Sequence, residues 1–184
     1  MQILGIDTET TGVDVTKDRI VELALILQDF DTRADRLRYV VRLNPEMRIN
    51  PKALAVHGIA SADLVGCKTF VQVAPLVVKI IDKVDLIVGH NLLKFDLPLL
   101  INELLRVGVM FTKSPMLFDT MVEGRGCTPD GKFPTLGELC YSLDVDYDSS
   151  PGAAHAADYD VDVTLRAFHR GIRLGIFKMP EPTE

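Results

Sequence analysis

The chain opens with three largely apolar stretches that are separated by polar turns. Residues 2–11 carry an apolar run that ends in two carboxylates, residues 19–27 are almost all apolar, and residues 37–43 alternate between apolar and polar. Runs and alternations of this length are typical of β-strands. Because the strands follow one another directly with short turns between them, we expect an antiparallel meander.

After residue 50 the pattern alternates between helices and short strands. The predicted helices cover residues 51–56, 70–83, a segment after Pro98 that ends near Val107, 135–143 and 154–174. Residues 85–89 and 115–119 are short strands, and the first of them is expected to run parallel to the opening strand. The pattern predicts an α/β domain, a mixed five-stranded sheet with helices on both faces.

Size and composition narrow the possible classes of protein. A length of 184 residues suits one domain, which we expect to span residues 1–177 before a short tail at 178–184. No apolar run reaches membrane length and no signal peptide is visible, so we expect a cytoplasmic protein with no membrane partner. The three cysteines, Cys67, Cys127 and Cys140, are widely spaced, which indicates a reducing compartment and argues against a zinc site.

The net charge of −6 argues against a broad basic surface for duplex DNA. A cluster of carboxylates with bound divalent ions would still attract nucleic acid, because the ions reverse the local charge. Asp7 and Glu9 form the core of such a cluster, since residues two apart on a strand share a face and Thr8 points away. Two carboxylates side by side resist burial unless cations neutralise them, and such oxygen ligands suit Mg²⁺ or Mn²⁺. The alternative to a metal-binding pair is that Asp7 and Glu9 lie at a strand end that emerges into a solvated turn.

Three further acidic residues are candidates for the same site. Asp96 follows a central strand, where open α/β sheets place ligands, and we expect Phe95 to pack inward and turn Asp96 outward. Asp96 could instead act as a helix cap. Asp160 lies on the same helical stripe as core residues and so needs a partner or a metal ion, whereas Asp158 and Asp162 are expected to face solvent. Glu22, inside the second strand, reads as a supporting residue near the metal region or as an edge position.

Together these residues resemble the DEDD superfamily of 3′-to-5′ exonucleases, in its DEDDh branch of proofreading subunits, RNase T and oligoribonuclease. The motif residues are Asp7, Glu9, Thr10, Thr11 and Gly12; His90, Asn91, Phe95 and Asp96; and His155, Asp160 and Thr164. Val56 to Ile59 resembles the substrate-contacting loop of the family, and Ala156 stands where the tyrosine branch has Tyr. The Gly- and charge-rich loop at 124–134 departs from the family pattern. The resemblance implies an RNase H-like fold.

The resemblance also implies a mechanism. Asp7, Glu9, Asp96 and Asp160 would hold two Mg²⁺ ions, for which Mn²⁺ can substitute, and His155 would be the general base if it lies on the loop before the last helix. The substrate-binding residues would be Thr10, Thr11, Gly12, His57, Asn91 and Phe95. His57 could also be a loop residue that caps the short helix before it.

The implied substrate is the 3′ end of a single strand or a frayed end, with DNA favoured over RNA and nucleoside 5′-monophosphates as products. A DNA polymerase is a candidate partner. Three alternatives remain: a non-catalytic or polymerase-associated nucleic-acid-binding protein on the same fold, an RNA-trimming exoribonuclease, and a haloacid-dehalogenase-type phosphatase. The phosphatase would need a second Asp where Glu9 stands.

Overall fold

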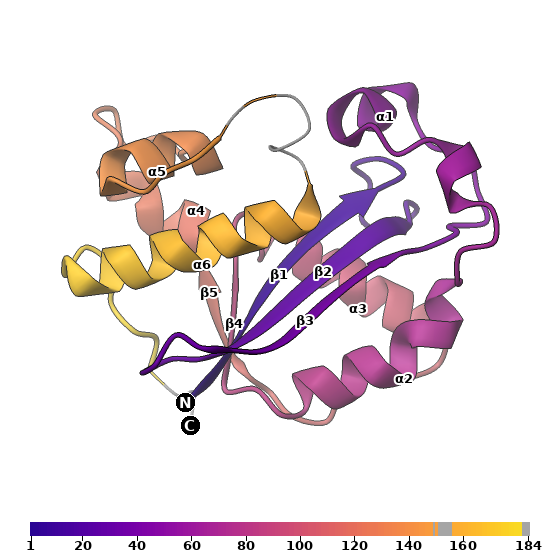
Figure 1. The fold of residues 1–184 in the computed structure, drawn as a ribbon, viewed down its shortest axis with the longest axis horizontal. Helices are drawn as coiled ribbons and strands as arrows, with labels where there is room; N and C mark the ends of the chain where they lie inside the picture. Colours follow the sequence, from indigo (N-terminus) through magenta and orange to yellow (C-terminus); the bar gives the residue numbers. More distant parts are fainter. Residues whose placement is uncertain (149, 151–155, 182–184) are drawn as a thin grey trace.

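A five-stranded sheet organises the protein, and the computed structural model describes residues 1–148, 150 and 156–181 of it (Figure 1). Its strand order is β3-β2-β1-β4-β5. The strands are β1 (Gln2–Thr10), β2 (Ile20–Asp29), β3 (Asp35–Arg42), β4 (Leu86–Gly89) and β5 (Met116–Asp119). β1, β2 and β3 pair in antiparallel fashion, whereas β4 runs parallel to β1 and β5 runs parallel to β4. The predicted meander and mixed sheet are therefore confirmed.

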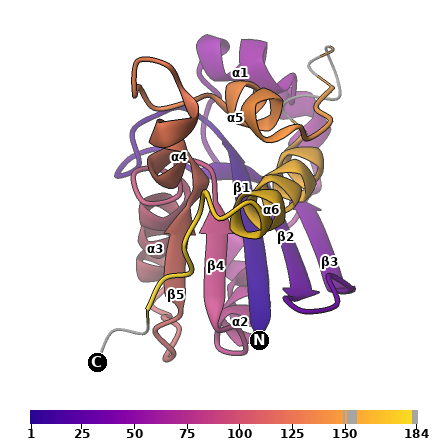
Figure 2. The ribbon, with the colours of Figure 1, turned by 90° about the vertical axis from the view of Figure 1, so that its left-hand side faces the viewer.

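The helices form a layer on each face of the sheet. They are α1 (Pro51–His57), α2 (Phe70–Ile81), α3 (Asp96–Arg106), α4 (Thr120–Glu123), α5 (Leu136–Leu143) and α6 (Ala157–Arg173), with 3₁₀ turns η1 (Ser61–Leu64) and η2 (Gly124–Cys127). Leu4 and Ile6 of β1 pack with α2 and α3, while Ile3 packs with α5 and α6 on the opposite face. Figure 2 shows α3 and α6 on opposite sides of the strands. The prediction of helices on both faces is confirmed.

Local sequence signals set most of the helix ends. Asn50 caps α1 through Lys52, with Pro51 at the first helical position, and Thr135 forms the expected capping box with Glu138 at the start of α5. α3 begins at Asp96, before Pro98, because a proline in the first turn loses no helical hydrogen bond. The single turn of α4 was not predicted, since four residues show no helical period. The predicted start of the last helix at 154 lies outside the described residues.

Close packing over a glycine brings α6 onto β1. A Cβ atom added at Gly5 would lie 2.6 Å from Cγ1 of Val161 and 2.8 Å from Cδ1 of Leu165. No larger residue fits there without movement, because both contacts are shorter than van der Waals distance. Gly5 therefore lets α6 cross directly over β1, so that the first turn of α6 lies near the end of the strand that carries Asp7 and Glu9.

A buried ion pair fixes α3 against the loop between β1 and β2. Both carboxylate oxygens of Glu103 accept hydrogen bonds from Arg19, at 2.5 and 3.0 Å, and the Glu103 side chain is 1% exposed. Arg106 donates to the loop carbonyls of Thr16 and Asp18. Charge-assisted bonds from two arginines stabilise the buried carboxylate and so hold the loop that follows β1 in place.

We expect Gly5→Ala to lower the free energy of unfolding by about 1–3 kcal/mol, because the added methyl group overpacks the contact with α6. Urea denaturation would measure this change. Gly126→Ala is the matched control, since a Cβ atom at Gly126 has no neighbour within 4 Å and its expected change is under about 0.5 kcal/mol. Equal stability of the two variants would contradict the close-packing account.

Candidate active site

The carboxyl end of β1 carries two carboxylates on the face that α6 covers. Asp7 and Glu9 project to this face, and Thr8 points to the other, as the strand period predicts. Across the sheet, Glu9 pairs directly with Glu22 of β2, and Glu22 pairs with Arg42 of β3. Arg42 Nε donates to Glu22 Oε2 at 2.9 Å. Glu22 is thus both ion-paired and next to the carboxylate cluster, as one of the two sequence readings expects.

Asp96 reaches the same place from the opposite face of the sheet. It is the first residue of α3, its exposure is only 3%, and it accepts a hydrogen bond from Thr8 Oγ1 at 2.7 Å. The expectation that Asp96 points outward is therefore wrong, and so is the expectation that Phe95 packs into the core, because Phe95 is half-buried and lines a surface groove.

The turn between β4 and α3 explains this reversal. Asn91 adopts a left-handed conformation with φ 66°, and its carbonyl accepts from the backbone N–H of Phe95. The carboxylate of Asp119 accepts from the backbone N–H groups of Asn91 at 2.9 Å and Leu93 at 3.0 Å. The tight turn directs Asp96 toward the sheet and leaves the ring of Phe95 at the surface. A local strand-to-helix pattern does not reveal such a turn.

Asp160 completes the group from the first turn of α6. It is buried, with 8% exposure, whereas Asp158 beside it is exposed, as expected. Asp162 is half-buried rather than free in solvent, and it accepts from Arg38 and Arg166. Thus Asp7, Glu9, Asp96 and Asp160 converge from β1, α3 and α6. His155 precedes α6 and lies outside the described residues.

The carboxylates repel one another, and their burial raises the free energy of their charged forms. Burial, followed by the negative charges of Asp96, Glu9 and Asp160, raises the pKa of Asp7 well above its usual range. Burial and the charge of Asp160 likewise raise the pKa of Glu9 to about 8. Burial also raises the pKa of Asp96 to about 7, against the hydrogen bond from Thr8, which lowers it. Such mutual repulsion marks a site that a cation would stabilise.

The donor set fits a hard divalent cation. Carboxylate oxygens are the preferred ligands of Mg²⁺ and Mn²⁺, and crowded acidic groups with raised pKa values gain most from a positive charge among them. Within the described part of the chain, no group of three His, Cys, Asp or Glu side chains stands in an arrangement that could hold a metal ion as it is. Any ligation therefore requires these side chains to adjust.

A groove of about 280 Å³ adjoins the carboxylates on the side of α1. Its lining includes Thr8, Glu9, Thr10, Gly12, Val13, Asn50, Lys52, Ala53, Val56, His57 and Phe95. The ring of His57 is fixed, because Nε2 lies 3.1 Å from the carbonyl oxygen of Thr10 and Nδ1 accepts from the backbone N–H of Ile59. The groove combines apolar surface, one lysine and the edge of the acidic cluster.

The structure separates the sequence-predicted binding residues into two groups. Thr10, Gly12, His57 and Phe95 line the groove. Thr11 does not, because it is buried and its hydroxyl donates to Asp18 Oδ1 at 2.7 Å and accepts from the backbone N–H of Arg19. Asn91 also lies outside the lining and serves as the pivot of the β4–α3 turn.

Sequence reasoning missed several residues around the site. Thr8 and Arg42 support the carboxylates, although the sequence offers no local signal for either pairing. In the loop at 124–134, the ring of Phe133 lies 5.1 Å from Lys94 Nζ and 4.8 Å from the guanidinium of Arg125. The carbonyl of Pro134 lies 3.1 Å from His90 Nε2, so this loop is joined to the turn before Asp96.

Comparison with known proteins places the chain in a family. The family model described as "Exonuclease", of the RNase T type, matches residues 4–168. The chain is 30% identical over 180 residues to DNA polymerase III subunit epsilon of Rickettsia prowazekii, which covers 95% of this chain and 76% of that protein. It is 28% identical over 171 residues to the same subunit of Escherichia coli, with 89% and 68% covered.

Other matches are to parts of larger proteins. PolC-type DNA polymerase III of Ureaplasma parvum is 31% identical over 163 residues, which are 88% of this chain but 11% of that protein. Escherichia coli exonuclease I, solved in complex with a dT13 oligonucleotide, superposes with a TM-score of 0.78 at 21% identity over 95% of this chain and 42% of that one. The chain therefore belongs to the exonuclease family and has the RNase H-like fold of the DEDDh-type 3′-to-5′ exonucleases.

Proposed function

We propose that this protein removes nucleotides from the 3′ end of single-stranded or frayed DNA and releases nucleoside 5′-monophosphates. The observation that carries the proposal is the convergence of four carboxylates from three separate elements beside a groove, where the pKa values of Asp7, Glu9 and Asp96 are raised. DNA is favoured over RNA because the similar proteins include DNA polymerase III epsilon subunits and an exonuclease I solved with dT13.

We infer that Asp7, Glu9, Asp96 and Asp160 hold two Mg²⁺ ions, for which Mn²⁺ can substitute; exonucleases of this family depend in general on divalent metal ions. Ions held there would activate a water molecule for attack and would stabilise the negative charge on the leaving oxygen. The chain's own residues prepare the site. Thr8 orients the carboxylate of Asp96, and Arg42 neutralises Glu22, which lies across from Glu9 on β2. From the resemblance to the DEDDh exonucleases, we assign His155 as the general base that takes the proton of the attacking water.

The groove is proposed to hold the terminal nucleotides. The ring of Phe95 and the fixed ring of His57 offer faces for bases, a mode of single-strand binding that tolerates any sequence. Thr10 and Gly12 lie along the same wall, and Lys52 offers a cation for a phosphate. Thr11 and Asn91 act through the backbone they hold in place, because neither lines the groove.

Several wider properties are proposals of the same kind. Residues 1–177 are taken as one exonuclease domain, and association with a DNA polymerase is proposed from the relatives named above. None of the described helices is long and apolar enough to cross a bilayer. The thiols of Cys67, Cys127 and Cys140 are free, which supports a reducing compartment such as the cytoplasm. The alternatives are an RNA-trimming exoribonuclease and a non-catalytic binding protein.

Digestion of 5′-labelled single-stranded DNA and RNA of one sequence tests this proposal. With Mg²⁺ or Mn²⁺ we expect a ladder that shortens from the 3′ end, faster for DNA, and no ladder with EDTA. Asp7→Asn should slow the reaction at least about 100-fold, because ligand charge and geometry fail together. Asp158→Asn, an exposed acid on α6, is the control and should leave the rate unchanged. A metal-independent ladder, or no ladder at all, would overturn the proposal.

The raised carboxyl pKa values also predict a pH dependence of stability without metal. The usual pKa values of Glu9 and Asp96 are 4.5 and 3.8, whereas in the folded protein the pKa values are raised to about 8 and about 7. Between the usual and the raised values the folded state therefore binds more protons than the unfolded state. The free energy of unfolding in EDTA should therefore fall by roughly 2–3 kcal/mol from pH 6.5 to pH 8.5. Below about pH 6.5 His169 acts in the opposite sense, since burial lowers its pKa to about 4.

Urea denaturation at the two pH values would measure this change. Glu9→Gln should flatten the slope, and Mg²⁺ should stabilise the wild-type protein more at pH 8.5 than at pH 6.5, because metal ligation requires deprotonated carboxylates. A slope that survives in Glu9→Gln at full size would show that other groups cause it.

Phe95→Ala should weaken single-strand binding by about 5- to 100-fold, the loss expected when one base loses its aromatic contact. The measurement is the KM for a short DNA strand, with kcat changed much less than KM. Leu93→Ala is the matched control, since Leu93 is exposed in the same turn but does not line the groove. Equal effects of both substitutions would indicate a disturbed turn rather than a lost contact.

A further inference from the structure

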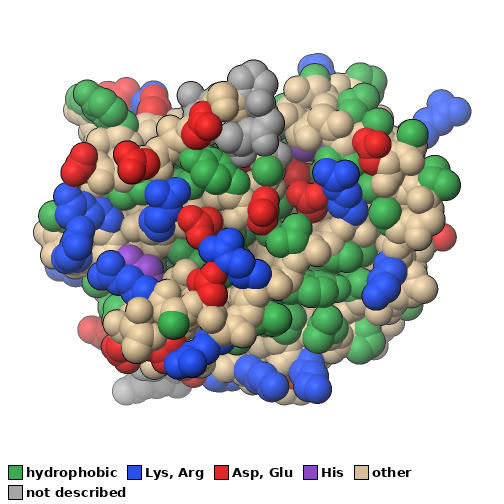
Figure 3. Space-filling view, viewed as in Figure 1, with side chains coloured by type: hydrophobic (Ala, Val, Ile, Leu, Met, Phe, Trp, Pro, Cys, Tyr) green, Lys and Arg blue, Asp and Glu red, His purple; other side chains and the backbone are tan. Residues whose placement is uncertain are grey.

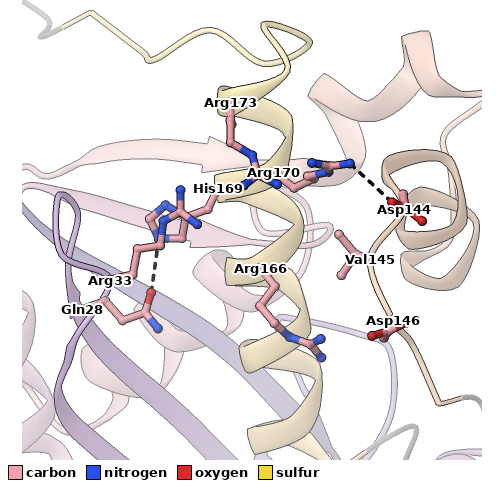
Figure 4. A pocket seen from close by; sticks show the side chains of 9 residues that line it. All are labelled: Gln28, Arg33, Asp144, Val145, Asp146, Arg166, His169, Arg170 and Arg173. Carbon is pink, nitrogen blue, oxygen red and sulfur yellow. Dashed lines mark hydrogen bonds and ion pairs between the residues drawn. The ribbon is translucent and has the colours of Figure 1, made fainter.

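A second cavity, of about 430 Å³, lies at the other end of α6 from the carboxylates (Figure 4). It is bounded by the C-terminal half of α6, the turn between β2 and β3, and the segment after α5. Gln28 in its wall pairs with Ile3 of β1, whereas Glu22 pairs with Glu9. Six residues of strand, roughly 20 Å, therefore separate this cavity from the acidic cluster.

Arginines from two distant segments dominate the cavity. Arg166, Arg170 and Arg173 recur at helical spacing on α6, and Arg33 comes from the β2–β3 turn. Figure 3 shows Lys and Arg side chains gathered over this end of α6. A helix C-terminus favours cations, which accounts for arginines on α6 but not for Arg33. The accumulation of positive charge stands out because the whole chain carries a net charge of −6.

Two of these guanidinium groups are bonded to other protein groups, and the other two have no ion-pair partner among the described residues. Arg166 binds Asp162 at 3.0 Å, and Arg170 donates to the carbonyl of Leu143 at 3.0 Å. For Arg33 and Arg173, the described part of the chain places no carboxylate within the 4.0 Å of an ion pair. Two cations that face one cavity, and to which the described residues supply no counter-ion, favour an anion between them.

The β2–β3 turn fixes the backbone of Arg33, whose side chain is exposed. Its backbone is left-handed, with φ 58°, and its N–H donates to the carbonyl of Asp29 at 2.8 Å. Figure 4 shows its side chain extending over His169 and Gln28, which lie 3.3 Å apart from Nε2 to Oε1. His169 is buried and packs on Phe30 at a ring distance of 5.6 Å. Burial and the charge of Arg33 lower the pKa of His169 to about 4, so the floor is neutral at pH 7.

We propose that this cavity binds a free nucleotide through its phosphate chain, at a site separate from the catalytic one. Guanidinium groups match phosphate oxygens in two-pronged hydrogen bonds, and the volume is in the range of small-molecule sites. On the opposite wall, Asp144 lies 3.4 Å from Arg170 through one carboxylate oxygen, and its other oxygen and Asp146 can accept hydrogen bonds from sugar hydroxyls or base amino groups. A ligand with phosphates at one end and donors at the other fits this asymmetry.

The same charges argue against a nucleic-acid strand that continues from the catalytic site. Asp158 is exposed, and Asp162 follows it one turn later, so both lie in the N-terminal part of α6, before Arg166. Phosphates that followed this surface would meet the exposed carboxylate of Asp158, and the charge of Asp162 is already paired with Arg38 and Arg166. The cavity is thus a discrete site, and the inference does not depend on the proposed exonuclease activity.

Calorimetric titration of the whole chain with ATP in EDTA at low salt tests the inference. EDTA keeps divalent ions from the acidic cluster, which then repels phosphate. We expect saturable binding of one ATP, weakened at least 10-fold in Arg33→Asn and in Arg173→Gln. Asn tolerates the left-handed turn and Gln preserves helix propensity, so both variants should fold with unchanged thermal stability. Arg36→Gln on the same hairpin, outside the cavity, is the control and should bind as the wild type does.

Three results would overturn the inference. One is the absence of saturable ATP binding at millimolar concentration, and another is an equal loss in Arg36→Gln, which would indicate unspecific charge attraction. The third is oligo-dT binding that requires Arg33 and Arg173 while ATP binding does not, which would make the cavity part of a strand path. Pyrophosphate should bind more weakly than ATP, and equal affinity would reject the role of Asp144 and Asp146.

Discussion

Repulsion among buried carboxylates is the constraint on which the rest of this structure depends. Asp7, Glu9, Asp96 and Asp160 occupy one end of the sheet, and burial together with their neighbours' charges raises the pKa values of the first three. Such a cluster opposes folding unless protons or cations neutralise it. The surrounding contacts limit this cost, since Thr8 donates to Asp96 and Arg42 neutralises Glu22. The stability of the fold and the metal binding proposed for this cluster therefore depend on the same electrostatic repulsion.

Helix α6 connects the two candidate sites of the molecule. Its close contact with β1 over Gly5 places Asp160 near the strand that carries Asp7 and Glu9, and its later turns carry the arginines of the second cavity. Acidic residues near its N-terminus and basic residues near its C-terminus also suit the helix dipole. One helix therefore separates the acidic cluster, proposed to bind cations, from the arginine-lined cavity, proposed to bind phosphate.

The turns around the sheet decide which side chains can meet a substrate. The left-handed Asn91 and the anchoring carboxylate of Asp119 direct Asp96 inward and leave Phe95 at the groove. The hydrogen bonds of His57 to Thr10 and Ile59 fix the opposite wall. These contacts make the groove a preformed surface beside the carboxylates, which reduces the entropy lost when a flexible strand binds.

The sequence alone determined the features that depend on short-range geometry. Strand alternation placed Asp7 and Glu9 together, apolar periodicity located the sheet and most helices, and the order of the acidic motifs indicated the exonuclease family. Only the tertiary structure decided the burial of Asp96, the exposure of Phe95, the bond from Thr8, and the meeting of Arg33 with Arg173. The reason is that covalent geometry fixes the spacing of near neighbours, whereas contacts between distant segments depend on packing and on turns whose backbone conformation no local pattern encodes.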